Sequence, residues 1–136
     1  MIVIDACVAL KWFVEESDTK KAVHIQEKLL SHKLTVIVPE LFFYEVTNVL
    51  KMKAVTNLTE VISAVQVLFD SNLRVVPVNR ELMEMAAYIS DKFDISIYDS
   101  IYVAIAKDFN CPLITADGVL INKVNLPIVK HLSHYI

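Results

Sequence analysis

The chain has 136 residues, a length typical of a single domain with one core, and 55% of them are hydrophobic. Thirteen basic and 16 acidic residues give a formal net charge of −3, which counts mildly against a nucleic-acid binder with an overall basic surface. The single glycine, Gly118, excludes the Rossmann, Walker A and kinase-type phosphate loops, because each needs several glycines for close backbone approach.

The chain also lacks signals for export or membrane insertion. No apolar run reaches the roughly 18 residues that suggest a membrane span, and no basic segment precedes an apolar stretch at the N-terminus. We therefore expect a cytoplasmic protein with no membrane partner. Cys7 and Cys111 lie in apolar surroundings, so we expect both to be free, buried thiols.

Strands alternate with helices along the chain. In chain order we expect a strand over 2–5, a helix over 18–32, a strand over 35–39, helices over 40–53 and 58–71, a strand over 73–78, helices over 79–93 and 96–109, and strands over 111–115 and 127–132. Short linkers and the βαβ pattern predict an α/β protein: a three-layer α/β/α domain spanning 1–136 with a mostly parallel, about five-stranded sheet.

Local signals refine three of these helices. Pro39 is expected in the first turn of the helix over 40–53, where a missing N–H costs nothing, and Asn79 is a plausible N-cap. Helical spacing assigns inward faces to two helices. Those faces are Leu58, Val61, Ile62, Val65, Leu68 and Phe69 in one helix, and Leu82, Met85, Ala86 and Ile89 in the other.

Two acids follow predicted strands. Asp5 ends the strand IVID, and Asp117 follows the strand PLIT. In open parallel sheets, sites form beyond the carboxyl ends of the strands. If both strands are parallel, their two carboxylates emerge at the same edge of the sheet.

Two further acids lie on helix faces that are otherwise apolar. Glu45 and Asp99 share stripes with apolar side chains, and charged groups are rarely buried unless they are paired or bind a metal. The stripes are Leu41, Val49 and Met52 for Glu45, and Tyr102, Val103 and Ala106 for Asp99. An acid in such a position is more informative than one on a solvated face.

Each acid also has a purely structural interpretation. These are a helix cap by Asp5, an ion pair of Glu45 with Lys11, a capping box of Asp99 with Ser96, and a turn at Asp117 and Gly118. Four independent structural roles, at two strand ends and on two inward helix faces, are a less persuasive account of these acids than one common function. Close carboxylates raise one another's pKa values and are stable as a group when a cation lies among them.

Oxygen-only ligands suit Mg²⁺ or Mn²⁺ rather than zinc. The histidines are far from these acids in sequence and are interpreted as surface or edge residues; they are His24, His32, His131 and His134. Without the four acids, 12 acidic residues remain against 13 basic ones, a balance of +1. A metal site would therefore account for the negative charge, and an anionic polymer remains compatible as a partner.

Four segments that carry these acids resemble PIN-domain ribonucleases, specifically the VapC-type toxins of VapBC toxin–antitoxin pairs. The segments are IVIDACVALKWF (2–13), PELFFYEVTNVL (39–50), YDSIYVAIAKDF (98–109) and PLITADGVL (112–120). Each alone is weak, but their order and spacing across nearly the whole chain form a specific signal.

The resemblance implies an α/β/α fold with an acidic pocket that holds Mg²⁺ or Mn²⁺. It assigns the pocket to Asp5, Glu45, Asp99 and Asp117, with Thr115 orienting a ligand or water. It also implies endonucleolytic cleavage of RNA that leaves 5′-phosphate and 3′-hydroxyl ends, a homodimer, and a cognate antitoxin that lays a helix in an apolar groove. Many relatives carry a polar or acidic residue where this chain has Gly118, so a fifth ligand and a second metal stay open.

Near the first acid, Lys11 is a candidate phosphate contact, with a solvated or acid-paired lysine as its alternative. Trp12 and Phe13 could stack on bases, although core or partner packing is the more common use. Other functions considered are an RNA-processing nuclease outside a toxin–antitoxin pair and an inactive binding module. A phosphorylated receiver would need an acidic neighbour beside Asp5, and a haloacid-dehalogenase-like phosphatase would need an aspartate at Cys7.

Overall fold

A computed structural model describes residues 1–53 and 56–135. Its five strands form one sheet in the order β3-β2-β1-β4-β5, and every neighbouring pair is parallel. The elements are β1 (Ile2–Ile4), α1 (Ala6–Leu10), α2 (Thr19–Leu30), β2 (Val36–Pro39), α3 (Leu41–Met52), α4 (Leu58–Asp70), β3 (Arg74–Val76), α5 (Arg80–Phe93), α6 (Ile97–Asp108), β4 (Leu113–Thr115), α7 (Gly118–Val124), β5 (Val129–His131) and the 3₁₀ turn η1 (Leu132–His134).

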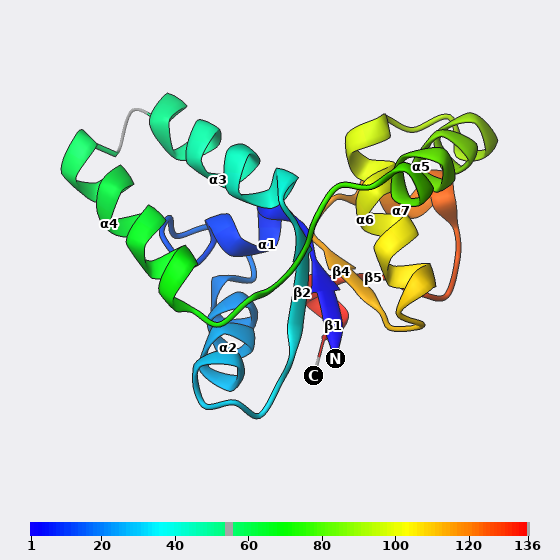
Figure 1. Cartoon of the computed structure of the whole chain (residues 1–136). Helices are drawn as coiled ribbons and strands as arrows, with labels where there is room; N and C mark the ends of the chain where they lie inside the picture. Colours follow the sequence, from blue (N-terminus) through cyan, green and yellow to red (C-terminus); the bar gives the residue numbers. More distant parts are fainter. Residues whose placement is uncertain (54–55, 136) are drawn as a thin grey trace.

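Helices cover both faces of the sheet, which confirms the predicted three-layer α/β/α architecture. Figure 1 shows α1 to α4 on one side of the strands and α5 to α7 on the other. Within these layers α1 packs on α3, α3 packs on α4, and α5 packs on α6. Because all strands run in the same direction, their carboxyl ends lie at one edge of the sheet, between the two groups of helices.

The core is centred on the three inner strands. Every residue of β1, β2 and β4 is buried, as expected for parallel strands covered on both faces. The outer strands β3 and β5 are partly exposed. The carboxyl ends of β1 and β4 therefore emerge from the buried centre of the sheet.

Two short helices were not predicted from the sequence. They are α1, which directly follows Asp5, and α7, which directly follows Asp117. Each spans two turns or fewer, too short for helical periodicity to stand out from the flanking apolar strands. The five longer predicted helices and the five predicted strands are all present. Pro39 ends β2 and pairs with Val76, so its predicted place in the first turn of a helix was wrong.

Several predicted inward faces were partly wrong. Leu58, Ile62 and Phe69 of α4 are exposed, whereas Val61, Ala64 and Leu68 are buried. When a helix has apolar residues on more than one face, their spacing alone does not predict which face packs against the core. The same reason applies to two further residues, Met52 of α3 and Met85 of α5, which are also exposed.

Other local predictions were confirmed. The Asn79 side chain caps α5 by accepting a hydrogen bond from the Leu82 N–H. Cys7 and Cys111 are both free, as predicted; Cys111 is buried as predicted, whereas Cys7 is only half-buried. Over residues 1–53 and 56–135, none of the helices combines the length and the apolar character needed to cross a bilayer.

Candidate acidic site

Asp5 lies between β1 and α1, at the carboxyl edge of the sheet, and its side chain is buried. Its Oδ1 accepts a hydrogen bond from the Val8 N–H at 3.3 Å, so it is also the N-cap of α1. Only 9% of its surface is exposed. Burial raises the pKa of this carboxyl from 3.8 to about 6, with a smaller contribution from the charge of Asp99, while hydrogen bonds from Cys7, Thr115 and Val8 oppose the rise.

Asp117 occupies the equivalent position after β4. Its Oδ1 accepts hydrogen bonds from the N–H groups of Val119 at 2.9 Å and Leu120 at 3.2 Å, which caps α7. Its own N–H donates to Thr115 Oγ1 at 2.9 Å. Since β1 and β4 are adjacent and parallel, the two capping acids meet at the same edge of the sheet, as predicted.

Asp99 lies in the first turn of α6, which packs against β1, β2 and β4. Ser96 is the N-cap and its Oγ accepts the Asp99 N–H at 3.0 Å, so the Ser96 half of the predicted capping box is present. The pKa of the Asp99 carboxyl is raised, mainly by burial and next by the charge of Asp117, while the Ser96 hydrogen bond lowers it. A structural cap and an electrostatically perturbed acid therefore coincide in this turn.

Glu45 reaches the same region from α3. Its Oε1 accepts a 2.6 Å hydrogen bond from the hydroxyl of Tyr102, a buried residue of α6. Burial raises the pKa of Glu45, as does the charge of Asp99 to a smaller extent, and the Tyr102 hydrogen bond lowers it. Tyr102 was predicted only as an inward-facing residue. A buried tyrosine needs a hydrogen-bond partner for its hydroxyl. Because Tyr102 lies one turn from Asp99 on an inward helix face, the sequence could have predicted a polar partner for it near the site.

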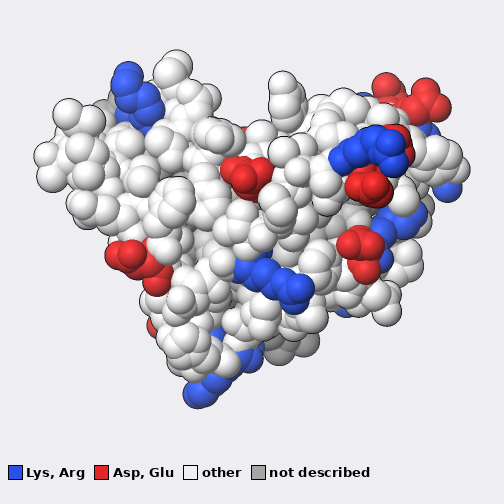
Figure 2. Space-filling model, viewed as in Figure 1, with Lys and Arg blue, Asp and Glu red and all other residues white. Residues whose placement is uncertain are grey.

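The four carboxylates form one electrostatic group. The charge of Asp99 acts on Asp5 and on Glu45, and the charge of Asp117 acts on Asp99. Figure 2 shows a depression in the molecular surface between the two groups of helices. Four acids from four separate segments are thus linked electrostatically through Asp99, at the carboxyl edge of the sheet.

This donor set fits a divalent cation of the Mg²⁺ or Mn²⁺ type. All four side chains offer oxygen ligands. Three of their carboxyl pKa values are raised, mainly by burial and to a smaller extent by neighbouring acids, and a cation would offset both effects. In residues 1–53 and 56–135, no three His, Cys, Asp or Glu side chains are already close enough to hold an ion. The carboxylates therefore share a region without being drawn into a closed coordination sphere.

The PIN domain family profile matches residues 2–125. The chain belongs to the PIN domain family. The match extends from β1 to the end of α7 and includes all four acids. The all-parallel α/β sheet agrees with this assignment.

Solved structures with the same fold are distant in sequence. A toxin–antitoxin complex from Klebsiella pneumoniae superposes with a TM-score of 0.74 at 13% identity, covering 97% of this chain and 98% of that one. FitAcB from Neisseria gonorrhoeae gives 0.72 at 17% identity, covering 98% and 99%. VapC20 of Mycobacterium tuberculosis, a sarcin–ricin loop cleaving toxin, gives 0.68 at 16% identity, covering 88% and 92%. No curated protein sequence matches this PIN domain significantly.

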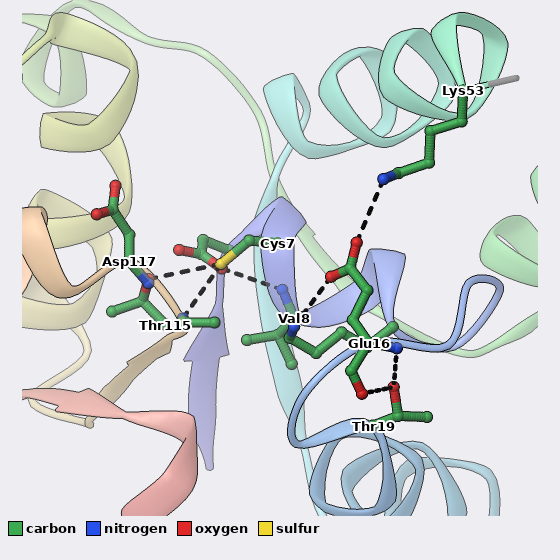
Figure 3. A network of polar contacts seen from close by, with 10 residues as sticks. Cys7, Val8, Glu16, Thr19, Lys53, Thr115 and Asp117 are labelled. Carbon is green, nitrogen blue, oxygen red and sulfur yellow. Dashed lines mark hydrogen bonds and ion pairs between the residues drawn. The ribbon is translucent and has the colours of Figure 1, made fainter.

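A buried lysine of this PIN domain is engaged by a neighbouring acid. Lys11 is 6% exposed, and its Nζ pairs with Glu16 Oε2 at 3.0 Å. Lys53 of the segment after α3 pairs with Oε1 of the same carboxylate at 3.2 Å, and Figure 3 shows this contact. The suggested partner of Lys11, Glu45, instead bonds to Tyr102. The phosphate contact by Lys11 stays a prediction.

The aromatic residues after Lys11 are part of the packing. The Trp12 indole N–H donates to the Ala22 carbonyl at 2.9 Å, and Trp12 meets Phe13 edge to face. Both are partly buried against the core. These contacts favour the packing interpretation, while stacking on bases stays a prediction.

Cys7 and Thr115 provide polar contacts between the two strand-end acids. The Cys7 thiol donates to Asp5 Oδ1, and its sulfur accepts the Ala116 N–H (Figure 3). Burial and the charge of Asp5 raise the pKa of this thiol, so it is a neutral donor at neutral pH. Thr115 was predicted to support the site, but Cys7 was expected only as a small buried residue. Because Cys7 follows Asp5 by only two residues, the sequence could have predicted a contact between their side chains.

Proposed function

We propose that this PIN domain, spanning residues 1–136, is a Mg²⁺- or Mn²⁺-dependent endoribonuclease and the toxin of a type II toxin–antitoxin pair. PIN domain nucleases are hydrolases that act on RNA. The observation that carries the proposal is the electrostatic coupling of Asp5, Glu45, Asp99 and Asp117 at one sheet edge. Helix capping explains the Asp5 and Asp117 carboxylates one at a time, but it does not explain why all four acids share one region.

The four carboxylates are the proposed metal ligands. A bound divalent cation would supply an activated water near neutral pH and would offset the charge that develops on the scissile phosphate. The protein's part is to hold the ligands in place. Tyr102 fixes Oε1 of Glu45, and the Thr115 hydroxyl fixes the backbone at Asp117. The number of ions depends on ligands beyond these four, and Gly118 contributes no side chain.

The proposed partners follow from the structural relatives and the family. The Klebsiella structure is a toxin–antitoxin complex, and its fold extends over nearly all of this chain. We propose a cognate antitoxin, an RNA substrate, a homodimeric state and a cytoplasmic location. An RNA-processing nuclease without an antitoxin would use the same acids, so the site itself does not separate the two roles.

The decisive experiment measures cleavage of RNA by the pure protein with Mg²⁺, with Mn²⁺ and with EDTA. Asp5→Asn, Glu45→Gln, Asp99→Asn and Asp117→Asn should each abolish the metal-dependent cleavage. Asp108→Asn is the matched control, because Asp108 lies on α6 like Asp99 but is exposed at its far end. Cleavage that survives in the four variants at the control rate would overturn the mechanism.

A second experiment addresses the toxin role. Expression of the wild type should arrest growth of a bacterial host, and Asp99→Asn should not. Co-expression of the protein encoded beside it should restore growth and should co-purify with the PIN domain. Cleavage of RNA without growth arrest would favour the RNA-processing role instead.

A further inference from the structure

The Cys7 side chain contacts both segments that carry the strand-end acids. Its thiol lies 2.6 Å from Asp5 Oδ1, and its sulfur lies 3.2 Å from the Ala116 N and 3.6 Å from Thr115 Oγ1. Figure 3 shows Cys7 close to Thr115, with a dashed contact running between them. One side chain in the first turn of α1 thus bridges the β1–α1 junction and the β4–α7 junction.

The bridge continues to Asp117. Thr115 Oγ1, which faces the Cys7 sulfur, also accepts the Asp117 N–H at 2.9 Å. The order of contacts is therefore Asp5, Cys7, Thr115 and the Asp117 backbone. The Val8 and Val119 N–H groups donate to the Asp5 and Asp117 carboxylates and orient each acid toward its own short helix, but these capping bonds do not link one acid to the other.

We propose that Cys7 is a positioning residue for the metal site: its thiol holds Asp5 and the Asp117 turn at a fixed separation. This inference rests on the proposed metal-dependent function. The thiol donates to the Asp5 carboxylate and accepts from the backbone of the neighbouring strand end, so it acts through the ligands and does not itself touch the substrate. Partners that orient metal ligands in this way are needed for tight binding.

The alternative is that Cys7 only fills space between α1 and β4. The two roles make different demands on the side chain. Serine keeps a donor and an acceptor on the same carbon, whereas valine keeps the bulk and removes both. If Cys7 only fills space, Cys7→Val should preserve Mn²⁺ binding better than Cys7→Ser. If Cys7 positions the ligands, Cys7→Ser should preserve it better.

The test measures Mn²⁺ binding by calorimetry in the absence of RNA. We expect Cys7→Val to weaken Mn²⁺ binding by about tenfold or more and Cys7→Ser to stay within about threefold of the wild type, in line with the effect of ligand-orienting partners on metal affinity. Cys111→Val is the matched control, because Cys111 is buried and free but contacts none of the four acids. It should bind Mn²⁺ like the wild type.

Two results would overturn the inference. One is equal Mn²⁺ affinity of Cys7→Val and the wild type, and the other is equal weakening by Cys7→Val and Cys7→Ser. Circular dichroism of the metal-free proteins monitors folding, and if Cys7→Val does not fold, comparison of Cys7→Ala with Cys7→Ser decides by the same criterion. A wild type that binds no Mn²⁺ contradicts the proposed function itself, so the two failures are distinguishable.

Discussion

The hydroxyl of Tyr102 donates a 2.6 Å hydrogen bond to Oε1 of Glu45 and so joins α6 to α3. These helices belong to opposite layers of the fold (Figure 1). The bond determines where the Glu45 carboxylate lies relative to Asp99, which is on the same helix as Tyr102. The position of Glu45 at the site therefore depends on a residue that is not itself a predicted ligand.

Tyr102→Phe should remove this restraint and leave the half-buried Glu45 carboxylate without its donor. We expect a loss of about 1 to 3 kcal/mol in the free energy of unfolding, the usual range for a hydrogen bond to a charged group. Urea denaturation of the metal-free protein measures it. Tyr88→Phe, which changes an exposed tyrosine of α5, is the control. Equal stability of the two variants would contradict the role of the Tyr102 hydroxyl.

Asp5 should make the stability of the metal-free protein depend on pH. Its folded-state pKa is raised from 3.8 to about 6, so the folded state favours the protonated carboxyl. Its contribution to stability is full below pH 3.8 and is lost as the pH rises through about 6. Asp5→Asn, which cannot ionise, should therefore be more stable than the wild type at pH 8, by up to about 3 kcal/mol.

Thermal denaturation in EDTA at a series of pH values tests this expectation. The difference between Asp5→Asn and the wild type should shrink as the pH falls toward 4. A wild type that is the more stable of the two at pH 8 would show that the ionised carboxylate is not strained in the metal-free fold. Asp108→Asn controls for the loss of one negative charge at an exposed position.

Divalent cations should stabilise the folded protein, because they bind the acidic group of the native state and not the unfolded chain. At 100 times the dissociation constant, one bound ion adds about 2.7 kcal/mol to the free energy of unfolding. Differential scanning fluorimetry with Mn²⁺ should show this rise for the wild type and for Asp108→Asn. Asp99→Asn should show a much smaller rise, and an equal shift in all three proteins would place the ion elsewhere.

Glu16 should stabilise the fold by pairing with buried Lys11. Glu16→Gln leaves that ammonium without its acid, and we expect a loss of about 1.5 to 3 kcal/mol in the free energy of unfolding, the range for hydrogen bonds to charged groups. Lys53→Met removes only the more exposed partner of the same acid and should cost less than about 1 kcal/mol. Chemical denaturation at pH 7 compares the two variants.

The pH dependence of this contribution has the opposite sign to that of Asp5. The Lys11 hydrogen bond, followed by that of Lys53, holds the pKa of Glu16 below its ordinary value of 4.5. The stabilisation is therefore present above pH 4.5 and is lost as the pH falls through the lowered pKa. A difference between Glu16→Gln and the wild type that persists unchanged into strong acid would contradict the ion pair.

Much of the fold could be predicted from local pattern. The buried strand IVID, the strand PLIT and the helical spacing between them were sufficient to predict a parallel α/β sheet, because hydrophobic periodicity and short connections restrict the topology strongly. The placement of Asp5 and Asp117 followed from that topology, since adjacent parallel strands end at the same edge. Asp99 was proposed as a site residue because it stands in a stripe that is otherwise apolar, and its role at the site stays a prediction.

Other features were decided by contacts between distant segments. The partner of Glu45 is 57 positions away in the chain, and the partner of the Cys7 sulfur at Ala116 is 109 positions away. The suggested pair of Lys11 with Glu45 did not form: Glu45 bonds to Tyr102 of α6, and Lys11 pairs with Glu16, five positions along the chain. The sequence by itself determined which acids end the strands and stand in apolar stripes. Only the tertiary structure decided which side chains hold them, because a hydrogen-bond partner is selected by proximity in space and by the need to satisfy buried polar groups.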